Sequence, residues 1–212
     1  MNESIKSYLE TYIPERSLFF KELERFAMEH RVPIMEPDGI ETLLQIMRIQ
    51  NPKRILEIGT AIGYSALRMA DAIKDAQIIT LEMDEERIAQ AENNIKRFNM
   101  ENRVTVLQGN ALELFDQVAE FGSFDAIFVD AAKGQYSKFF SMYKGLLTEN
   151  GCIYTDNVLF KGLVAEENQT ENKRLSSVAA KIKQFNQWLF EQKDFISVII
   201  PVGDGLAVSK KI

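Results

Sequence analysis

The sequence contains very little of the chemistry used for disulfides, soft-metal sites and histidine-based catalysis. Its 212 residues include one cysteine, Cys152, and one histidine, His30. A single cysteine excludes a disulfide scaffold and zinc sites built from cysteine pairs, and a single histidine excludes a histidine-rich metal site. A Ser-His-Asp or Cys-His mechanism would have to use His30, which lies at the end of a predicted helix. Enzymes of these types are therefore disfavoured.

Long apolar runs and a signal-like N-terminus are also absent. No run approaches the length of about 20 residues that spans a membrane, and the first ten residues lack a basic-then-apolar pattern. These features predict a cytoplasmic protein that has no membrane partner. The composition is 46% hydrophobic and 26% charged, which excludes disorder as the main state and allows a substantial core.

The charge balance is acidic, with 25 Lys and Arg against 31 Asp and Glu and a formal net charge of −6 at pH 7. General nucleic-acid coat proteins are basic, so this class is disfavoured. A local basic patch that contacts one folded RNA is still compatible with the composition, because net charge averages over the whole surface.

Two hydrophobic periodicities divide the chain. Apolar residues recur at helical spacing over residues 1–50, which predicts a helical N-terminal preface. From residue 53 onward, short apolar runs alternate with amphipathic stretches. The predicted strands cover 54–58, 77–81, 104–107, 124–129, 152–155, 195–200 and 205–209, and the predicted helices cover 64–73, 84–98, 111–118, 136–147 and 173–192. Asp84 is the predicted N-cap of the helix 84–98.

This alternation predicts an α/β fold with a mostly parallel sheet that helices cover on both faces. The last two strands are joined by a turn at Gly203-Asp204-Gly205 and are predicted to form an antiparallel pair at one edge. The whole chain, 1–212, is predicted to be a single domain that includes the preface. Ligands of such sheets bind outside the carboxyl ends of the strands.

Glycines and polar residues follow the first three predicted strands. Gly59 and Gly63 follow the first strand, where they allow a sharp turn and close approach of a ligand, although Glu57 replaces the first glycine of the dinucleotide fingerprint. Glu82, after the second strand, has the position of an acid that binds ribose hydroxyls. Asn110, after the third, either binds an adenine edge or caps the next helix. Together they favour a nucleoside-bearing cofactor.

Hard oxygen ligands follow the fourth and fifth predicted strands. Asp130 ends the fourth strand, and Asp156 and Asn157 end the fifth. Two carboxylates and an amide oxygen suit Mg²⁺. Lys133 lies one helical turn after Asp130, where a partly desolvated amine has a lowered pKa and takes up a proton. The alternative is that Asp156 and Asn157 cap a loop and Lys133 is a solvated charge.

These motifs together resemble the cation-dependent O-methyltransferases, a family that includes the catechol and caffeoyl-CoA enzymes. They are Glu57-Ile-Gly-Thr-Ala-Ile-Gly-Tyr-Ser65, Glu82, Asp130-Ala-Ala-Lys133, Thr155-Asp-Asn-Val158 and Val202-Gly-Asp-Gly-Leu206, in the order of the family. The resemblance covers residues 33–212. It implies a Rossmann-like class I methyltransferase fold with seven strands, the last antiparallel, and it implies S-adenosylmethionine and Mg²⁺ or another divalent cation as cofactors.

The resemblance also implies a role for each matched residue. The implied cofactor-binding residues are Met35, Glu57, Gly59, Tyr64, Ser65, Glu82, Asn110, Ala111 and Asp130. The implied metal ligands are Asp130, Asp156 and Asn157, and the implied catalytic residues are Lys133, as general base, and Asp130. The reaction needs no covalent enzyme intermediate, which agrees with the scarcity of His and Cys.

The segment after Asp130 indicates the acceptor. Small-phenol members of the family usually have Asp-Ala-Asp-Lys here, whereas this chain has Ala132 before Lys133. The string Asp-Ala-Ala-Lys-Gly-Gln-Tyr resembles the bacterial branch that methylates 5-hydroxyuridine at the tRNA wobble position, forming 5-methoxyuridine. The tRNA anticodon loop is therefore the predicted substrate. A small catechol or hydroxycinnamoyl-type acceptor is the alternative, and a noncatalytic cofactor-binding or RNA-binding module is a third hypothesis.

An RNA substrate requires basic residues near the pocket. The candidates are Lys133, Lys138, Lys161, Lys173, Arg174, Lys181 and Lys183, with a second group of Arg16, Lys21, Arg25 and Arg31 on the N-terminal helices. The segment 161–174 also contains Glu166, Glu167 and Glu171, so a solvated loop is an equal alternative for it. An apolar face that includes Tyr8 and Tyr12 could pack against a second copy of the chain. Because members of the resembled family often form homodimers, we predict a homodimer.

Overall fold

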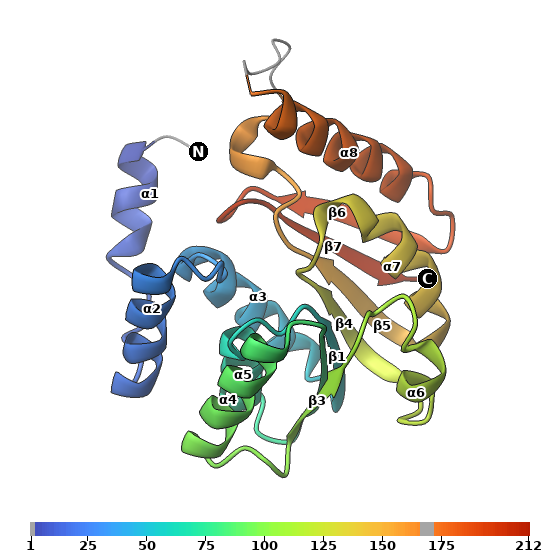
Figure 1. Ribbon diagram of the computed structural model, residues 1–212. Coiled ribbons are helices and arrows are strands. Elements are labelled where there is room, and N and C mark those ends of the chain that lie inside the picture. The colour runs from blue at the N-terminus through green and yellow to red at the C-terminus, as the bar shows by residue number, and fades with distance from the viewer. Residues whose placement is uncertain (1–2, 166–171) are drawn as a thin grey trace.

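The computed structural model describes residues 3–165 and 172–212 and shows one sheet with helices packed on both sides (Figure 1). The helices are α1 (Glu3–Glu10), α2 (Leu18–His30), α3 (Pro37–Gln50), α4 (Tyr64–Ala72), α5 (Glu85–Arg97), α6 (Phe115–Ala119), α7 (Tyr136–Tyr143) and α8 (Lys173–Phe190). The strands are β1 (Arg54–Ile58), β2 (Gln77–Glu82), β3 (Val104–Gln108), β4 (Phe124–Val129), β5 (Leu147–Thr155), β6 (Phe195–Ile200) and β7 (Leu206–Lys211). Short 3₁₀ turns lie at Lys133–Gln135, Lys144–Leu146 and Phe160–Gly162.

The seven strands lie in the order β3-β2-β1-β4-β5-β7-β6. The pairs among β3, β2, β1, β4 and β5 are parallel, whereas β7 is antiparallel to both β5 and β6. The predicted Rossmann-like α/β fold with an antiparallel last strand is therefore confirmed. The predicted antiparallel pair is present, with β6 at the edge and β7 inserted between β5 and β6.

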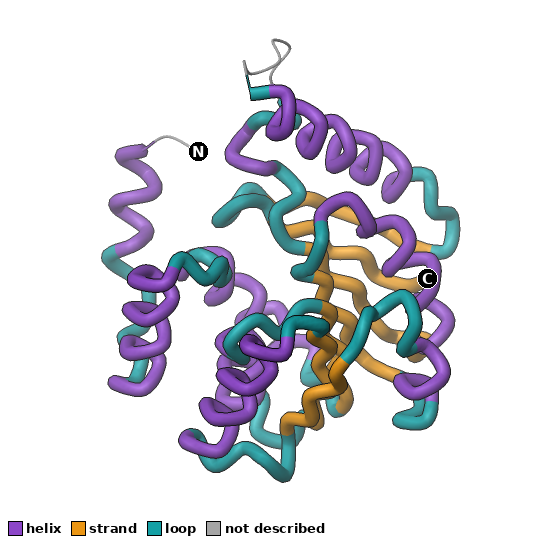
Figure 2. Tube along the Cα trace, viewed as in Figure 1, coloured by secondary structure: helices purple, strands orange, loops and turns teal. Residues whose placement is uncertain are grey.

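The strands lie between helices on both faces of the sheet (Figure 2). Their alternating side chains pack in two apolar clusters, one on each face. Ile55 of β1 packs in the cluster formed with α2, α3 and α4, while the adjacent Leu56 packs in the cluster formed with α7 and α8. Successive residues of a strand point to opposite faces, so burial on both faces requires the near-continuous apolar runs seen in the sequence.

Several predicted elements differ from the structure in length. The helix predicted over 136–147 ends at Tyr143, because the chain tightens into a 3₁₀ turn at Lys144–Leu146 and then enters β5. The predicted helix 111–118 is confined to Phe115–Ala119, because the side chain of Asn110 accepts a hydrogen bond from the amide of Leu112 and stabilises a turn. The strand predicted over 152–155 begins five residues earlier, at Leu147, which is paired with Phe124. Gly63, predicted to approach a ligand, instead caps α4 with a φ of 82° and packs on Ala91.

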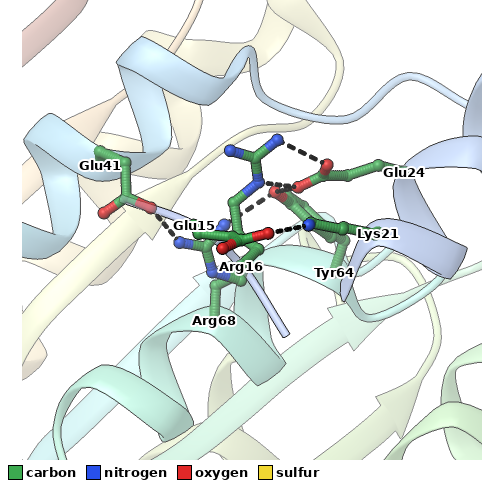
Figure 3. Close-up of polar contacts among 7 residues, drawn as sticks. All are labelled: Glu15, Arg16, Lys21, Glu24, Glu41, Tyr64 and Arg68. Atoms are coloured by element: carbon green, nitrogen blue, oxygen red, sulfur yellow. Dashed lines mark hydrogen bonds and ion pairs between the residues drawn. The ribbon is translucent and has the colours of Figure 1, made fainter. Parts of the chain in front are cut away.

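A buried polar cluster joins the N-terminal helices to α4 (Figure 3). The guanidinium of Arg68 donates hydrogen bonds to Glu41 of α3 and, at 2.9 Å, to the hydroxyl of Tyr64. That hydroxyl donates to Glu24 of α2 at 2.7 Å, and Glu24 also receives two hydrogen bonds from Arg16. The cluster thereby fixes α2 and α3 against α4. Within residues 3–165 and 172–212, no helix is long and apolar enough to cross a membrane.

Candidate functional site

A cavity of about 930 Å³ lies where the carboxyl ends of the parallel strands meet. It is lined by residues from the ends of the first five strands, from the segment between α2 and α3, and from the starts of α4, α5 and α7. They are Pro33, Ile34, Met35, Ile58, Gly59, Thr60, Ala61, Tyr64, Ser65, Leu81, Glu82, Met83, Asp84, Arg87, Gly109, Asn110, Ala111, Leu112, Asp130, Ala131, Ala132, Lys133, Gln135, Phe139 and Asn157. Of the predicted cofactor-binding residues, all except Glu57 line this cavity.

The floor of the cavity depends on a close approach of two strand ends. Gly59 has a φ of 104°, and a Cβ at this position would lie 2.1 Å from the carbonyl oxygen of Asp130. Any side chain at position 59 would force β1 and β4 apart. Glycine at position 59 therefore allows the ends of β1 and β4 to lie close together below the cavity.

Glu82 is held by backbone amides at the end of β2. One carboxylate oxygen accepts a hydrogen bond from the amide of Ala61 at 2.9 Å, and the other accepts from Met83 at 2.9 Å and Asp84 at 3.1 Å. The side chain of Asp84 caps α5 by accepting from the amide of Arg87, as predicted for this residue. Glu82 is therefore a fixed acceptor at the cavity wall, suited to paired hydroxyls such as those of a ribose.

Glu57 lies behind the cavity wall rather than in it. It is fully buried, and it accepts hydrogen bonds from the hydroxyls of Ser65 and Thr80. Burial raises the pKa of Glu57 to about 8, although both hydroxyls favour the carboxylate. A role in cofactor binding stays a prediction for Glu57, and it would act through Ser65, which does line the cavity.

Two predicted cofactor residues line the cavity with their polar groups bonded elsewhere. The hydroxyl of Tyr64 is directed to Glu24 and Arg68, so it is not available to a ligand (Figure 3). The amide oxygen of Asn110 accepts from Leu112, and its amide nitrogen donates to Glu113 at 3.1 Å. Asn110 does not cap the next helix, because α6 starts after Leu114; its side chain stabilises the turn before that helix, and its contact with adenine stays a prediction.

The predicted metal ligands and general base lie together at the ends of β4 and β5. Burial raises the pKa values of Asp130 and Asp156, and proximity to Asp130 raises that of Asp156 further. Asn157 has a φ of 59° and donates from its amide nitrogen to Asp156 at 2.9 Å. The ammonium of Lys133 donates to the amide oxygen of Asn157. Burial lowers the pKa of Lys133, against the opposing effect of Asp130.

The donor set of this cluster fits a hard divalent cation. Two buried carboxylates repel each other, and a bound cation relieves that repulsion. No three His, Cys, Asp or Glu side chains are placed to hold a metal ion in the part of the chain that the structure describes. A cation would therefore need the amide oxygen of Asn157 in addition to Asp130 and Asp156, which is a combination that suits Mg²⁺.

Comparison with known proteins identifies the family. The family model described as O-methyltransferase matches residues 10–212. The chain belongs to the O-methyltransferase family. It is 36% identical over 140 residues to the catechol O-methyltransferase of Niastella koreensis, covering 65% of this chain and 63% of that protein. It is 29% identical over 215 residues to the caffeoyl-CoA O-methyltransferase of Medicago sativa, covering 95% and 87%.

Solved structures of O-methyltransferases share the whole fold. A candidate caffeoyl-CoA O-methyltransferase from Staphylococcus aureus is 35% identical, with a TM-score of 0.92 and coverage of 100% of both chains. The SAH-bound methyltransferase PaMTH1 of Podospora anserina is 27% identical, with a TM-score of 0.87 and coverage of 100% and 97%. The predicted resemblance to the catechol and caffeoyl-CoA enzymes is thereby confirmed.

The sequence analysis gave no site role to two residues that lie near this cluster, Asp204 and Phe160. Asp204, in the turn between β6 and β7, accepts a hydrogen bond from the amide of Lys161 and adds negative charge near Asp156 and Lys133. The ring of Phe160 lies 5.9 Å from the ammonium of Lys133, and Phe160 has a φ of 47°. Only the flanking glycines of Asp204 signalled a turn, and nothing local in the sequence placed that turn beside β5.

Proposed function

We propose that this O-methyltransferase transfers the methyl group of S-adenosylmethionine to the 5-hydroxyl of 5-hydroxyuridine at the tRNA wobble position, in a reaction that depends on Mg²⁺. The observation that carries the reaction type is the convergence of Asp130, Asp156, Asn157 and Lys133 beside the cavity. The cytoplasm, where tRNA is found, is the corresponding location.

The cavity supports S-adenosylmethionine as cofactor. Glu82 presents a fixed carboxylate at the end of β2, and Ser65 and Met35 line other parts of the wall. The relatives from Podospora anserina and Bacillus cereus were solved with SAH, the demethylated form of this cofactor. A cavity of about 930 Å³ is large enough for a nucleoside joined to an amino acid.

The residues at the strand ends supply the remaining chemistry. When bound, Mg²⁺ lowers the pKa of the acceptor hydroxyl that it contacts. Lys133 takes up the proton of that hydroxyl, because burial already disfavours its charged form. The cavity fixes donor and acceptor next to each other, and this positioning accounts for much of the acceleration. In 5-hydroxyuridine the 5-hydroxyl lies beside the 4-carbonyl, so it offers two neighbouring oxygens as a catechol does.

Unpaired basic residues near the mouth of the cavity support an RNA acceptor. Helix α8 contains four basic residues and no acidic ones. One of them, Lys181, packs against the turn that contains Lys133, since a Cβ on Gly134 would lie 3.6 Å from the Lys181 ammonium. Neither Lys161 nor Lys181 forms an ion pair within residues 3–165 and 172–212. Glu166, Glu167 and Glu171 lie outside the described residues.

The alternative basic face on the N-terminal helices is not supported to the same degree. Arg16 is paired with Glu24 and Lys21 with Glu15, whereas Arg25 and Arg31 form no ion pair among the residues that the structure describes. A basic side chain whose charge is already matched gains less from an RNA phosphate, because the existing pair has to be broken first. The α8 side of the cavity is therefore the better candidate for phosphate contacts.

A small catechol or a hydroxycinnamoyl-type ester is the second candidate acceptor. The names of the relatives favour it, since they include a catechol O-methyltransferase and several caffeoyl-CoA O-methyltransferases. The strand-end residues would act identically on such an acceptor. The choice between the two acceptors therefore has to be made by experiment.

The test measures transfer of labelled methyl from S-adenosylmethionine, with Mg²⁺, to two acceptors in parallel. One is an anticodon stem-loop that carries 5-hydroxyuridine, with an unmodified uridine stem-loop as control. The other is a pool of catechol and caffeoyl-CoA. Label in the modified stem-loop alone supports the RNA proposal, and label in the small acceptors alone contradicts it. Full activity in the presence of a chelator would remove the metal from the proposal.

We also propose that the protein is a homodimer. Ile5 and Tyr8 of helix α1 are exposed, as is Tyr12, which follows that helix, and the edge strand β6 exposes Ile196 and Val198. Exposed apolar side chains of this kind favour burial against a second copy. Light scattering after size-exclusion chromatography measures the mass, and a single species near 24.3 kDa would contradict the proposal.

A further inference from the structure

Two consecutive residues near Lys133 have a backbone conformation that side chains disfavour. Phe160 has a φ of 47° and Lys161 a φ of 55°, both in the left-handed region that glycine adopts most readily. Both residues lie in the 3₁₀ turn Phe160–Gly162, which follows the end of β5. A residue other than glycine keeps this conformation only where the surrounding contacts fix it. The groups that hold this turn therefore determine where the ring of Phe160 lies.

The turn between β6 and β7 supplies such contacts. The carboxylate of Asp204 accepts a hydrogen bond from the amide of Lys161, and the backbone carbonyl of Asp204 accepts from the amide of Leu159 at 2.9 Å. The carbonyl of Gly205 accepts from the amide of Val158 at 3.0 Å. Gly205 has a φ of 91°, and a Cβ there would lie 2.7 Å from the amide nitrogen of Leu159, so this approach requires glycine. Asp204 thus binds the segment after β5 through both its backbone and its side chain.

The same turn is anchored on its other side by α3. The amide of Gly203 donates a hydrogen bond to the carboxylate of Asp38 at 3.1 Å. Gly203 has a φ of 51°, and a Cβ at this position would lie 3.4 Å from the Cα of Gly39. Because neighbours hold the turn from both sides, the carboxylate of Asp204 has a fixed place beside the Lys161 amide.

The segment that Asp204 holds carries the ring that lies next to the ammonium of Lys133. The centroid of the Phe160 ring is 5.9 Å from this ammonium, within the range of a cation–π contact. Lys133 also donates a hydrogen bond to the amide oxygen of Asn157. That oxygen belongs to the donor set that fits a divalent cation, so a bound cation would compete with Lys133 for it. The contact between Lys133 and the Phe160 ring is compatible with a bound cation.

We propose that Asp204 positions Lys133 through the amide of Lys161 and the ring of Phe160. The hydrogen bond from the Lys161 amide keeps the turn left-handed, and the turn keeps the ring next to the ammonium. Without the carboxylate of Asp204, the turn relaxes towards a conformation that its side chains favour, and Lys133 loses the ring. This inference rests on the proposed function in one respect, since it takes Lys133 as the group that receives the proton of the acceptor hydroxyl.

The first test is a double-mutant cycle on methyl transfer to the 5-hydroxyuridine stem-loop, with saturating S-adenosylmethionine and Mg²⁺. Asp204→Ala should lower kcat by about tenfold, a part of the effect of a general base, with little change in KM. Phe160→Leu should lower kcat to a similar extent. The double variant should be no slower than the slower single variant, because both substitutions remove the same contact. Effects that multiply in the double variant would overturn the inference.

The conservative variant separates the hydrogen bond of Asp204 from its charge. Asp204→Asn keeps an oxygen that accepts from the Lys161 amide, so its kcat should stay within about twofold of the wild type. An Asp204→Asn protein as slow as Asp204→Ala would mean that the negative charge acts on Lys133 directly, which would overturn the inference.

The second test needs neither cofactor nor acceptor. Trinitrobenzenesulfonate modifies exposed amines, and mass spectrometry of the peptides gives the rate at Lys133, which is half-buried. Asp204→Ala and Phe160→Leu should each raise this rate a few-fold, because the amine loses the ring beside it, and Asp204→Asn should leave it unchanged. The matched control is Asp194→Ala, which removes an exposed carboxylate just before β6, at the end of that strand away from the turn. It should change neither the labelling rate nor kcat.

The two tests distinguish a failure of this inference from a failure of the proposed function. Methyl transfer to caffeoyl-CoA alone would contradict the RNA substrate, and the same cycle with caffeoyl-CoA would then decide the role of Asp204. An unchanged labelling rate of Lys133 in Asp204→Ala would overturn the inference for either acceptor.

Discussion

The two walls of the cavity differ in how their polar groups are satisfied. At the N-terminal wall, Tyr64 lines the cavity, and behind it Arg68, Glu41 and Glu24 complete a closed set in which every charge meets an opposite charge or a hydroxyl. On the wall formed by the ends of β4 and β5, Asp130 and Asp156 are buried close to each other, and Gln135 has an unpaired oxygen. The polar groups of the first wall are paired within the chain, whereas the second wall holds two buried carboxylates whose mutual repulsion a bound cation would relieve.

The same contrast holds for basic residues at the surface. Arg16 and Lys21 near α2 are ion-paired, while Lys161 and Lys181 near the cavity mouth form no ion pair in the part of the chain described by the structure. Pairing within the chain stabilises the fold, and unpaired charge is available for a partner. Substitutions on the two sides should therefore have separable effects on stability and on activity.

The largest expected effect is on activity, from removal of a strand-end carboxylate. Asp156→Ala should lower the rate of methyl transfer by about 10²–10³-fold, because a group that holds charge at the reacting centre is lost. The melting temperature should stay the same or rise, since a buried repulsion with Asp130 is removed. Rate and thermal melt are measured on the same preparation. An active Asp156→Ala protein, or an inactive one that is unfolded, would contradict the contrast between the walls.

The next effect is on stability, from the opposite wall. Arg68→Met should lower the free energy of unfolding by about 3–5 kcal/mol, because the carboxylate of Glu41 is left buried without its partner. Adding Glu41→Met should recover most of this loss. Denaturant unfolding measures both. The matched control is Lys21→Ala, which breaks an exposed pair with Glu15 and should change stability by less than about 0.5 kcal/mol.

A pH dependence should come from the buried Glu57. Its pKa is raised from an ordinary 4.5 to about 8, so between these values the unfolded chain binds fewer protons than the folded one. Stability that is complete below pH 4.5 is therefore lost as the pH rises towards 8. The loss between pH 5.5 and pH 8 should be roughly 3 kcal/mol. Glu57→Gln should flatten this part of the curve measured by denaturant unfolding, and an unchanged slope would show that another group is responsible.

The smallest effect is on RNA affinity. Lys181→Ala should weaken binding of an anticodon stem-loop a few-fold and reduce the salt dependence of the logarithm of affinity by about one. The paired residue Lys21 offers the control, since Lys21→Ala should leave both quantities unchanged. Fluorescence anisotropy at several salt concentrations measures them. Equal effects of the two substitutions would mean that an ion pair within the protein does not determine which lysines contact the RNA.

The sheet and most strand-end residues were predictable from the sequence because their signals are local. Asp84 was predicted as a helix cap from its position before an amphipathic run, and the structure confirms this. The strand 54–58 was predicted with its correct bounds from an apolar run that ends at a glycine. The clustering of Asp130 with Asp156 followed from the rule that parallel strands end at the same edge of the sheet.

What could not be predicted depends on contacts between distant segments. The hydroxyl of Tyr64 is directed away from the cavity because Glu24, forty residues earlier in the chain, accepts from it. The early start of β5 depends on the pairing of Leu147 with Phe124. The amide oxygen of Gln135 is unpaired because no hydrogen-bond donor lies within reach of it in the folded chain. A sequence pattern does not show which donors surround a side chain after folding.

The position of β7 in the sheet has a consequence for how the chain is made. Strand β6 leaves the ribosome before β7, yet within the sheet β6 is bonded to β7 alone. Until residues Leu206–Lys211 emerge, β6 has no partner and β5 presents a free apolar edge. A stalled or prematurely released chain would therefore display two strand edges at once, which favours aggregation. In this topology, the sheet closes only when Leu206–Lys211 insert between β5 and β6.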